Sequence, residues 1–305
     1  MEQSFIIKAV VIGVLLVGSD NTIIELVKKM ERDLGVTITW HRDLVERVRQ
    51  EQKIPEGYSL SVSSISPDGT AYAWSSYPNV GPRERFPFLM VKSLKEGIST
   101  VRVEGRIAIA SSVSTEAEVI VALASPIDPA QMLKWELLAI DRRSGNKVYD
   151  MTRFVTKFGL RNSITDIRVS GPGTLVALGT DDEMQVLEIP GGRTVYAGPG
   201  NCPRISPDGK RLAFVKDNSI WIYSFSDRSI VKMNKEKRVK GVGGWSPDGR
   251  FLLAGAWTRP VLLATGKRQI VIDTATGDYA TNGSLSEGDG GNQYAWVSTM
   301  LMGSQ

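Results

Sequence analysis

The tetrapeptide Ser-Pro-Asp-Gly occurs three times in this chain. Its residues suit a tight turn, because proline fixes φ at the first central position, aspartate accepts hydrogen bonds from nearby amides, and glycine adopts the conformation that leaves the turn. An apolar residue precedes each copy and an apolar run follows it, so each copy is expected to join two strands. The predicted turn residues are Ser66, Pro67, Asp68, Gly69, Ser206, Pro207, Asp208, Gly209, Ser246, Pro247, Asp248 and Gly249.

Weaker copies of the same unit begin at Ser114 and Ser170, and residues 295–298 begin a sixth unit. The serines at positions 66, 114, 170, 206 and 246 are separated by 48, 56, 36 and 40 residues. A period of this size, with up to four short strands in each unit, is typical of β-propeller blades. The sequence therefore predicts an all-β, six-bladed propeller with five complete blades visible. A C-terminal strand at 293–298, paired with an earlier strand, is expected to close the ring.

The pattern apolar-Ser-Pro-Asp-Gly-x-x-apolar-Ala-apolar, at 205–214 and again in part at 65–74, resembles the repeat of TolB-like propellers. The resemblance extends over about residues 58–300. It implies a fold more than an activity, because such repeats are found in periplasmic scaffolds, in the propellers of prolyl-oligopeptidase-type peptidases and in free-standing binding proteins. It implies here a non-catalytic scaffold for protein interaction or ligand binding, periplasmic or otherwise extracytoplasmic, with a cytoplasmic location as the alternative.

Two scarce residue types limit the chemistry of the chain. Cys202 is the single cysteine and His41 the single histidine, so an internal disulfide, a Cys/His zinc cluster and a two-histidine metal site are all excluded. We predict no catalytic residue, no metal and no cofactor. The alternative function is an enzyme acting on sugars or lactones through channel carboxylates, for which Asp166 is the acid placed on an inner strand. The basic residues are scattered among acids, which argues against nucleic acid as a partner.

A binding surface is predicted on the face opposite the tetrapeptide turns, where the connections between second and third strands lie. Exposed aromatic and arginine side chains are good anchors for a protein partner. The candidate binding residues are Tyr77, Arg83, Arg85, Asp181, Asp217, Trp257 and Arg259. The glycine-rich stretches at 241–244 and 288–291 are predicted to be connections that cross between blades.

The N-terminal extension, residues 1–57, is assigned apart from the propeller at 58–305. An apolar run at 9–17 is either the core of a signal or anchor segment within 1–19, which would bring the chain near a membrane, or a buried strand. A helix is predicted at 22–34, ended by Gly35, followed by a strand at 36–40 and a charged helix at 43–52.

Overall fold

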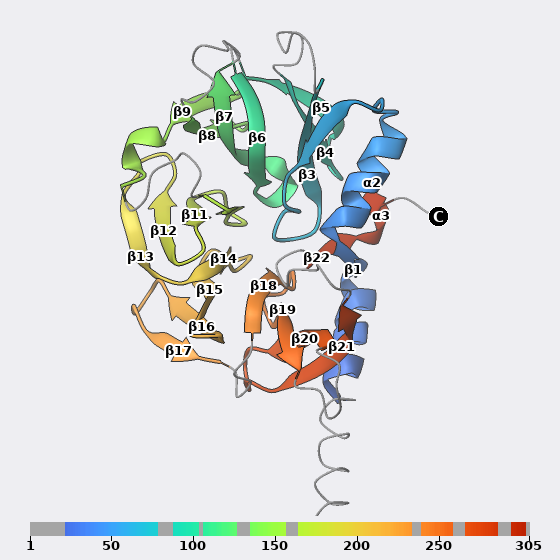
Figure 1. The fold of residues 1–305 in the computed structure, drawn as a ribbon, viewed down its shortest axis with the longest axis vertical. Helices are drawn as coiled ribbons and strands as arrows, with labels where there is room; N and C mark the ends of the chain where they lie inside the picture. Colours follow the sequence, from blue (N-terminus) through green and yellow to red (C-terminus); the bar gives the residue numbers. More distant parts are fainter. Residues whose placement is uncertain are drawn as a thin grey trace, which may run out of the picture.

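The computed structural model describes residues 22–78, 88–103, 106–126, 135–156, 164–233, 239–258, 266–285 and 294–302. Five four-stranded antiparallel sheets and one two-stranded sheet follow one another around a ring (Figure 1). Each four-stranded sheet uses four consecutive strands, as a propeller blade does. The predicted all-β, six-bladed propeller is therefore confirmed.

The strands of the first three blades run in order from the inner to the outer strand. The first blade holds β2 (Tyr58–Val62), β3 (Ala71–Pro78), β4 (Phe88–Ser93) and β5 (Gly97–Arg102). The second holds β6 (Arg106–Val113), β7 (Val119–Pro126), β8 (Glu136–Asp141) and β9 (Lys147–Asp150). The third holds β10 (Asp166–Val169), β11 (Leu175–Gly179), β12 (Glu183–Glu188) and β13 (Thr194–Pro199).

The remaining strands form the other half of the ring. The fourth blade holds β14 (Asn201–Ile205), β15 (Arg211–Lys216), β16 (Ser219–Ser224) and β17 (Ile230–Lys232). The fifth holds β18 (Val239–Trp245), β19 (Phe251–Thr258), β20 (Gly266–Asp273) and β21 (Tyr279–Leu285). At the sixth position, β22 (Tyr294–Ser298) pairs with β1 (Val36–Trp40). The short 3-10 helices are η1 (Thr115–Ala117) and η3 (Thr152–Phe154), and the α-helices after β1 and β22 are α2 (His41–Glu51) and α3 (Thr299–Met302).

The repeated serine has one structural role in all five complete blades. Its buried hydroxyl accepts a hydrogen bond from the backbone N–H five residues later, at the start of the second strand. The five pairs are Ser66 with Ala71 (2.9 Å), Ser114 with Val119 (2.8 Å), Ser170 with Leu175 (3.0 Å), Ser206 with Arg211 (2.9 Å) and Ser246 with Phe251 (2.8 Å). The repeat thus satisfies a buried donor at the corner where each blade's first strand turns into its second.

These turns meet one another around the ring. A Cβ atom added to Gly171 would lie 2.0 Å from the carbonyl oxygen of Pro207, and one added to Gly69 would lie 2.8 Å from that of Trp296. Gly69 also has φ +77°, a left-handed conformation that suits glycine. The turn of the third blade therefore packs against the turn of the fourth, and the turn of the first blade packs against β22.

Hydrophobic clusters fill the space between successive blades. Ala71 and Leu89 of the first blade, for example, share a cluster with Ile120 of the second, and Ile205 of the fourth blade shares one with Ala177 of the third. A blade that lies between two others is thus apolar on both faces, which explains why the second strands contain almost unbroken apolar runs.

Helices complete the sixth position, where only two strands are present. The helix at residues 22–34 places Ile23 and Val27 in a cluster with Phe251 of the fifth blade and Trp296 of β22. On the other side, α2 buries Leu44 and Val48 against the first blade. Figure 1 shows both helices along the side of the ring where β1 and β22 pair. The predicted closure by a C-terminal strand is confirmed, and its partner is β1.

One predicted connection is wrong. Residues 241–244 belong to β18, the inner strand of the fifth blade, and do not cross between blades. Register shifts interrupt the pairing of β18 with β19 between Val239 and Gly241 and between Val242 and Trp245. Glycine suits such irregular strands, and it also permits close approach of another group to the backbone. The stretch at 288–291 lies outside the described residues.

Candidate functional site

A cavity of about 700 Å³ lies inside the ring, and every inner strand contributes to its wall. Residues from β2, β6, β10, β14, β18 and β22 line it, together with the end of β1 and the start of α2. A volume of this size is typical of sites for small molecules. Side chains of the inner strands therefore decide what the cavity can hold.

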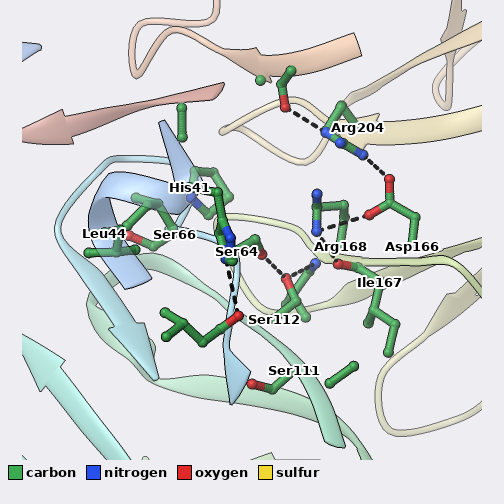
Figure 2. Close-up of a pocket in the computed structure, with 18 of the residues that line it drawn as sticks. His41, Leu44, Ser64, Ser66, Ser111, Ser112, Asp166, Ile167, Arg168 and Arg204 are labelled. Carbon is green, nitrogen blue, oxygen red and sulfur yellow. Dashed lines mark hydrogen bonds and ion pairs between the residues drawn. The ribbon is translucent and has the colours of Figure 1, made fainter. Parts of the chain in front are cut away.

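Three charged side chains form a network in this wall (Figure 2). The Asp166 carboxylate on β10 makes an ion pair with Nη1 of Arg168 at 2.9 Å and a second with Nη1 of Arg204 on β14. Arg204 also donates from Nε to the carbonyl oxygen of Gly243 at 2.6 Å. The Asp166 and Arg204 side chains are only 6% and 4% exposed, so this network joins the third, fourth and fifth blades away from bulk water.

Arg168 differs from Arg204 in its exposure to the cavity, with 23% of its side chain accessible. The pKa of its guanidinium is lowered to about 10, first by burial and next by the positive charge of Arg204, while the charge of Asp166 acts in the opposite direction. The group remains protonated at neutral pH. One carboxylate therefore serves two guanidinium groups, and the network carries an excess positive charge.

His41 lies at the junction of β1 and α2 and lines the same cavity. Its Nε2–H donates to the carbonyl oxygens of Val62 (3.1 Å) and Ser63 (3.3 Å), which fixes the proton on Nε2. Burial, followed by the charge of Arg168, lowers the pKa of this imidazole. His41 is therefore a neutral, partly buried group that ties α2 to the first blade.

Ser64 and Ser112 form a polar pair on the cavity wall, between the first and second blades (Figure 2). Their hydroxyl oxygens lie 2.9 Å apart, and Ser112 Oγ also accepts from the backbone N–H of Val169 at 3.0 Å. Val169 directly follows Arg168 on β10, so the serine pair adjoins the charged network.

The predicted loop-face residues lie at the far ends of the second strands. Tyr77 and Trp257 are the penultimate residues of β3 and β19, while Asp181 and Asp217 are exposed in the turns after β11 and β15. The other three, Arg83, Arg85 and Arg259, lie outside the described residues, as does the apolar run at 9–17.

The sequence prediction missed the cavity network, although it placed Asp166 on an inner strand. The available signal was the alternation of Asp166 and Arg168 with apolar residues in β10, which puts both charges on one face of the strand. Arg204 had no such signal, because its pairing with Asp166 depends on how the third and fourth blades pack.

The described residues were also compared with the requirements of a metal site and of a membrane-spanning helix. Within the described part of the chain, no three histidine, cysteine, aspartate or glutamate side chains come together as metal ligands would. The one carboxylate among the described cavity residues is Asp166. None of the described helices is long and apolar enough to cross a membrane.

Similar proteins are found through structure alone. No protein-family model matches the chain, and no curated protein matches its sequence. The propeller domain of the Trilobed protease from Pyrococcus furiosus is 9% identical, with a TM-score of 0.51 over 74% of this chain and 71% of that one. Oligogalacturonate lyase from Vibrio parahaemolyticus is 14% identical, with a TM-score of 0.50 over 75% of this chain and 65% of that one.

A putative TolB from Agrobacterium tumefaciens is also similar, at 14% identity and a TM-score of 0.49, over 79% of this chain and 96% of that one. At these identities the comparisons concern the fold and leave activity open. The chain therefore has the β-propeller fold that its Ser-Pro-Asp-Gly repeats predicted.

Proposed function

We propose that this propeller is a non-catalytic scaffold that binds a small ligand in its central cavity. The observation that carries the proposal is the Asp166–Arg168–Arg204 network. Its carboxylate is paired with two guanidinium groups, one on each oxygen, so neither oxygen is placed to take a proton from a substrate. A cavity with fixed polar groups and an apolar remainder is suited to holding a ligand in one orientation.

The alternative is a propeller enzyme that acts on sugars or lactones. The similarity in fold to an oligogalacturonate lyase supports keeping it. Acid–base chemistry on a sugar usually requires two carboxylates, or a carboxylate with a metal. The described cavity wall supplies Asp166 alone, which favours binding over turnover.

A ligand panel distinguishes the two functions. Thermal unfolding would be followed with neutral sugars, sugar acids, lactones and short peptides, and mass spectrometry would monitor each compound for conversion. We expect saturable stabilisation without conversion, lost in Ser111→Phe, which fills the cavity, and kept in Ser226→Phe on the surface. Conversion of a compound that stops in Asp166→Asn would establish the enzyme instead, and absence of stabilisation throughout the panel would refute cavity binding.

We also propose that a protein partner uses the loop face around Tyr77, Asp181, Asp217 and Trp257. Its support is that the four residues lie at or just after the end of the second strand in four different blades. Replacement of Asp181 and Asp217 by lysine tests this role. The double variant should capture less of the partner in a crosslinking experiment at that face, and its cavity should bind small ligands as the wild type does. An extracytoplasmic location is proposed with it. A mature N-terminus near Asp20 in the native host would support a cleaved signal segment, and recovery of the protein in the cytoplasmic fraction would contradict the proposed location.

A further inference from the structure

The guanidinium of Arg168 has donors that the described structure does not use. Within the described residues it contacts Asp166 at 2.9 Å and the carbonyl oxygen of Ile167 at 2.9 Å, and both contacts are made by Nη1. An arginine side chain has five N–H donors. Nε–H and the two N–H groups of Nη2 therefore have no partner in the described part of the chain.

These unused donors form the edge of the guanidinium that matches a carboxylate. Nε–H and one Nη2–H project side by side, and the two oxygens of a carboxylate can accept both at once. Asp166 occupies Nη1, so it leaves this edge open. The side chain is 23% exposed, and it lines the cavity.

The Ser64–Ser112 pair supplies one more donor. A single hydroxyl proton is enough for the hydrogen bond between the two Oγ atoms, whichever serine donates it. Ser112 Oγ accepts from Val169 N–H, which uses no hydroxyl proton. One hydroxyl proton of the pair is therefore left without a partner among the described residues.

We propose that the cavity binds the carboxylate group of a small molecule, with Arg168 as the charged anchor and the Ser64–Ser112 pair as an additional donor. This inference rests on the proposed binding function and specifies the ligand class. The network of two arginines and one aspartate has an excess of one positive charge, which a monoanionic carboxylate neutralises. A phosphate dianion would instead leave a negative charge in a buried site, at a cost in desolvation.

Formate and formamide test the proposal directly, because formate is the smallest carboxylate and formamide its neutral counterpart. Each would be titrated into the full-length protein while the arginine Nε–Hε resonances are followed by NMR. The Arg168 signal is assigned by its loss in Arg168→Gln. We expect a saturable shift of that signal with formate and none with formamide.

Variants of Arg168 should change the affinity of the cavity for formate by predictable amounts. Arg168→Gln should weaken formate binding by roughly 10- to 100-fold, as expected for loss of hydrogen bonds to a charged group. Arg168→Lys keeps the charge without the two parallel donors, so it should fall between Gln and the wild type. Arg193→Gln is the matched control, because Arg193 is exposed, pairs with Glu188 and does not line the cavity. Its binding should equal that of the wild type.

Each result has a separate meaning. If neutral compounds of the ligand panel bind in the cavity while formate leaves the Arg168 signal in place, the carboxylate inference fails and the binding function stands. If inorganic phosphate displaces formate and binds more tightly, the ligand class is wrong. If neither the panel nor formate binds, both proposals fail together.

Discussion

Replacing Asp166 by asparagine isolates the energetic role of the cavity network. Asparagine keeps the shape of the side chain but removes the negative charge that faces Arg168 and Arg204. Because Asp166 and Arg204 are almost fully buried, bulk water cannot compensate for the loss. Removing one member of a buried ion pair typically costs about 3–5 kcal/mol of unfolding free energy. We expect Asp166→Asn to fall in that range in equilibrium urea unfolding.

The two arginines should respond differently to removal. Arg204→Met takes away a buried partner of Asp166 and the donor to Gly243, so it should be strongly destabilising. Arg168→Gln removes the excess charge and leaves a balanced pair, so it should change the free energy of unfolding by less than about 1 kcal/mol. The order of the two effects follows from burial and hydrogen bonding, because Arg204 is 4% exposed and bonds to Gly243, whereas Arg168 is 23% exposed.

A double-mutant cycle completes the test. If Asp166 and Arg204 form one unit, the cost of Asp166→Asn combined with Arg204→Met should be smaller than the sum of the single costs by about 0.5–3 kcal/mol. Asp278→Asn, at an exposed turn, is the control and should change stability by less than about 0.5 kcal/mol. A cost of Asp166→Asn below about 1 kcal/mol, or strict additivity with Arg204→Met, would refute the coupled network.

Three further substitutions test other parts of the fold by urea unfolding. Ser246→Ala leaves the buried Phe251 N–H unpaired and should cost about 1–3 kcal/mol, whereas Ser226→Ala should cost almost nothing; equal costs would contradict the role given to the repeated serine. Gly171→Ala forces its Cβ against the Pro207 carbonyl and should cost about 1–3 kcal/mol, whereas Gly191→Ala, which has open space, should be tolerated. Because the folded-state pKa of His41 is lowered, its contribution to stability is present above pH 6.5 and is lost as the pH falls through the folded-state pKa. His41→Gln should flatten that decline, and a wild type that gains stability on acidification would exclude this explanation.

The repeats made most of the fold predictable from the sequence. A turn of defined chemistry recurs there, and a single geometry satisfies all of its copies, so local residues were enough to locate the five complete blades. The copy at Ser114 shows how far this extends. It has no proline or glycine, yet Ala117 takes a positive φ of 55° where the other copies place glycine, and the Ser114 hydroxyl still accepts from Val119.

The cavity was less predictable because its properties come from contacts between blades. Arg204 is separated from Asp166 by 38 positions, and its local sequence resembles that of any strand residue before the turn. Residues 241–244 were misassigned for a related reason. Read locally, these glycines indicate a connection between strands. They are equally compatible with an inner strand whose backbone is approached closely by a neighbouring blade, and the carbonyl oxygen of Gly243 accepts a hydrogen bond from Arg204 of the fourth blade.

Ring closure and the cavity depend on the same residues. The last strand is held by two segments from the beginning of the chain, since β22 pairs with β1 and the Ser298 N–H donates to the carbonyl oxygen of Gly69 at 2.8 Å. His41 follows β1 immediately and forms part of the cavity wall. Breaking the β1–β22 pairing would therefore displace His41 and open the wall beside Ser64, so a stable closure is a condition for a preformed binding site.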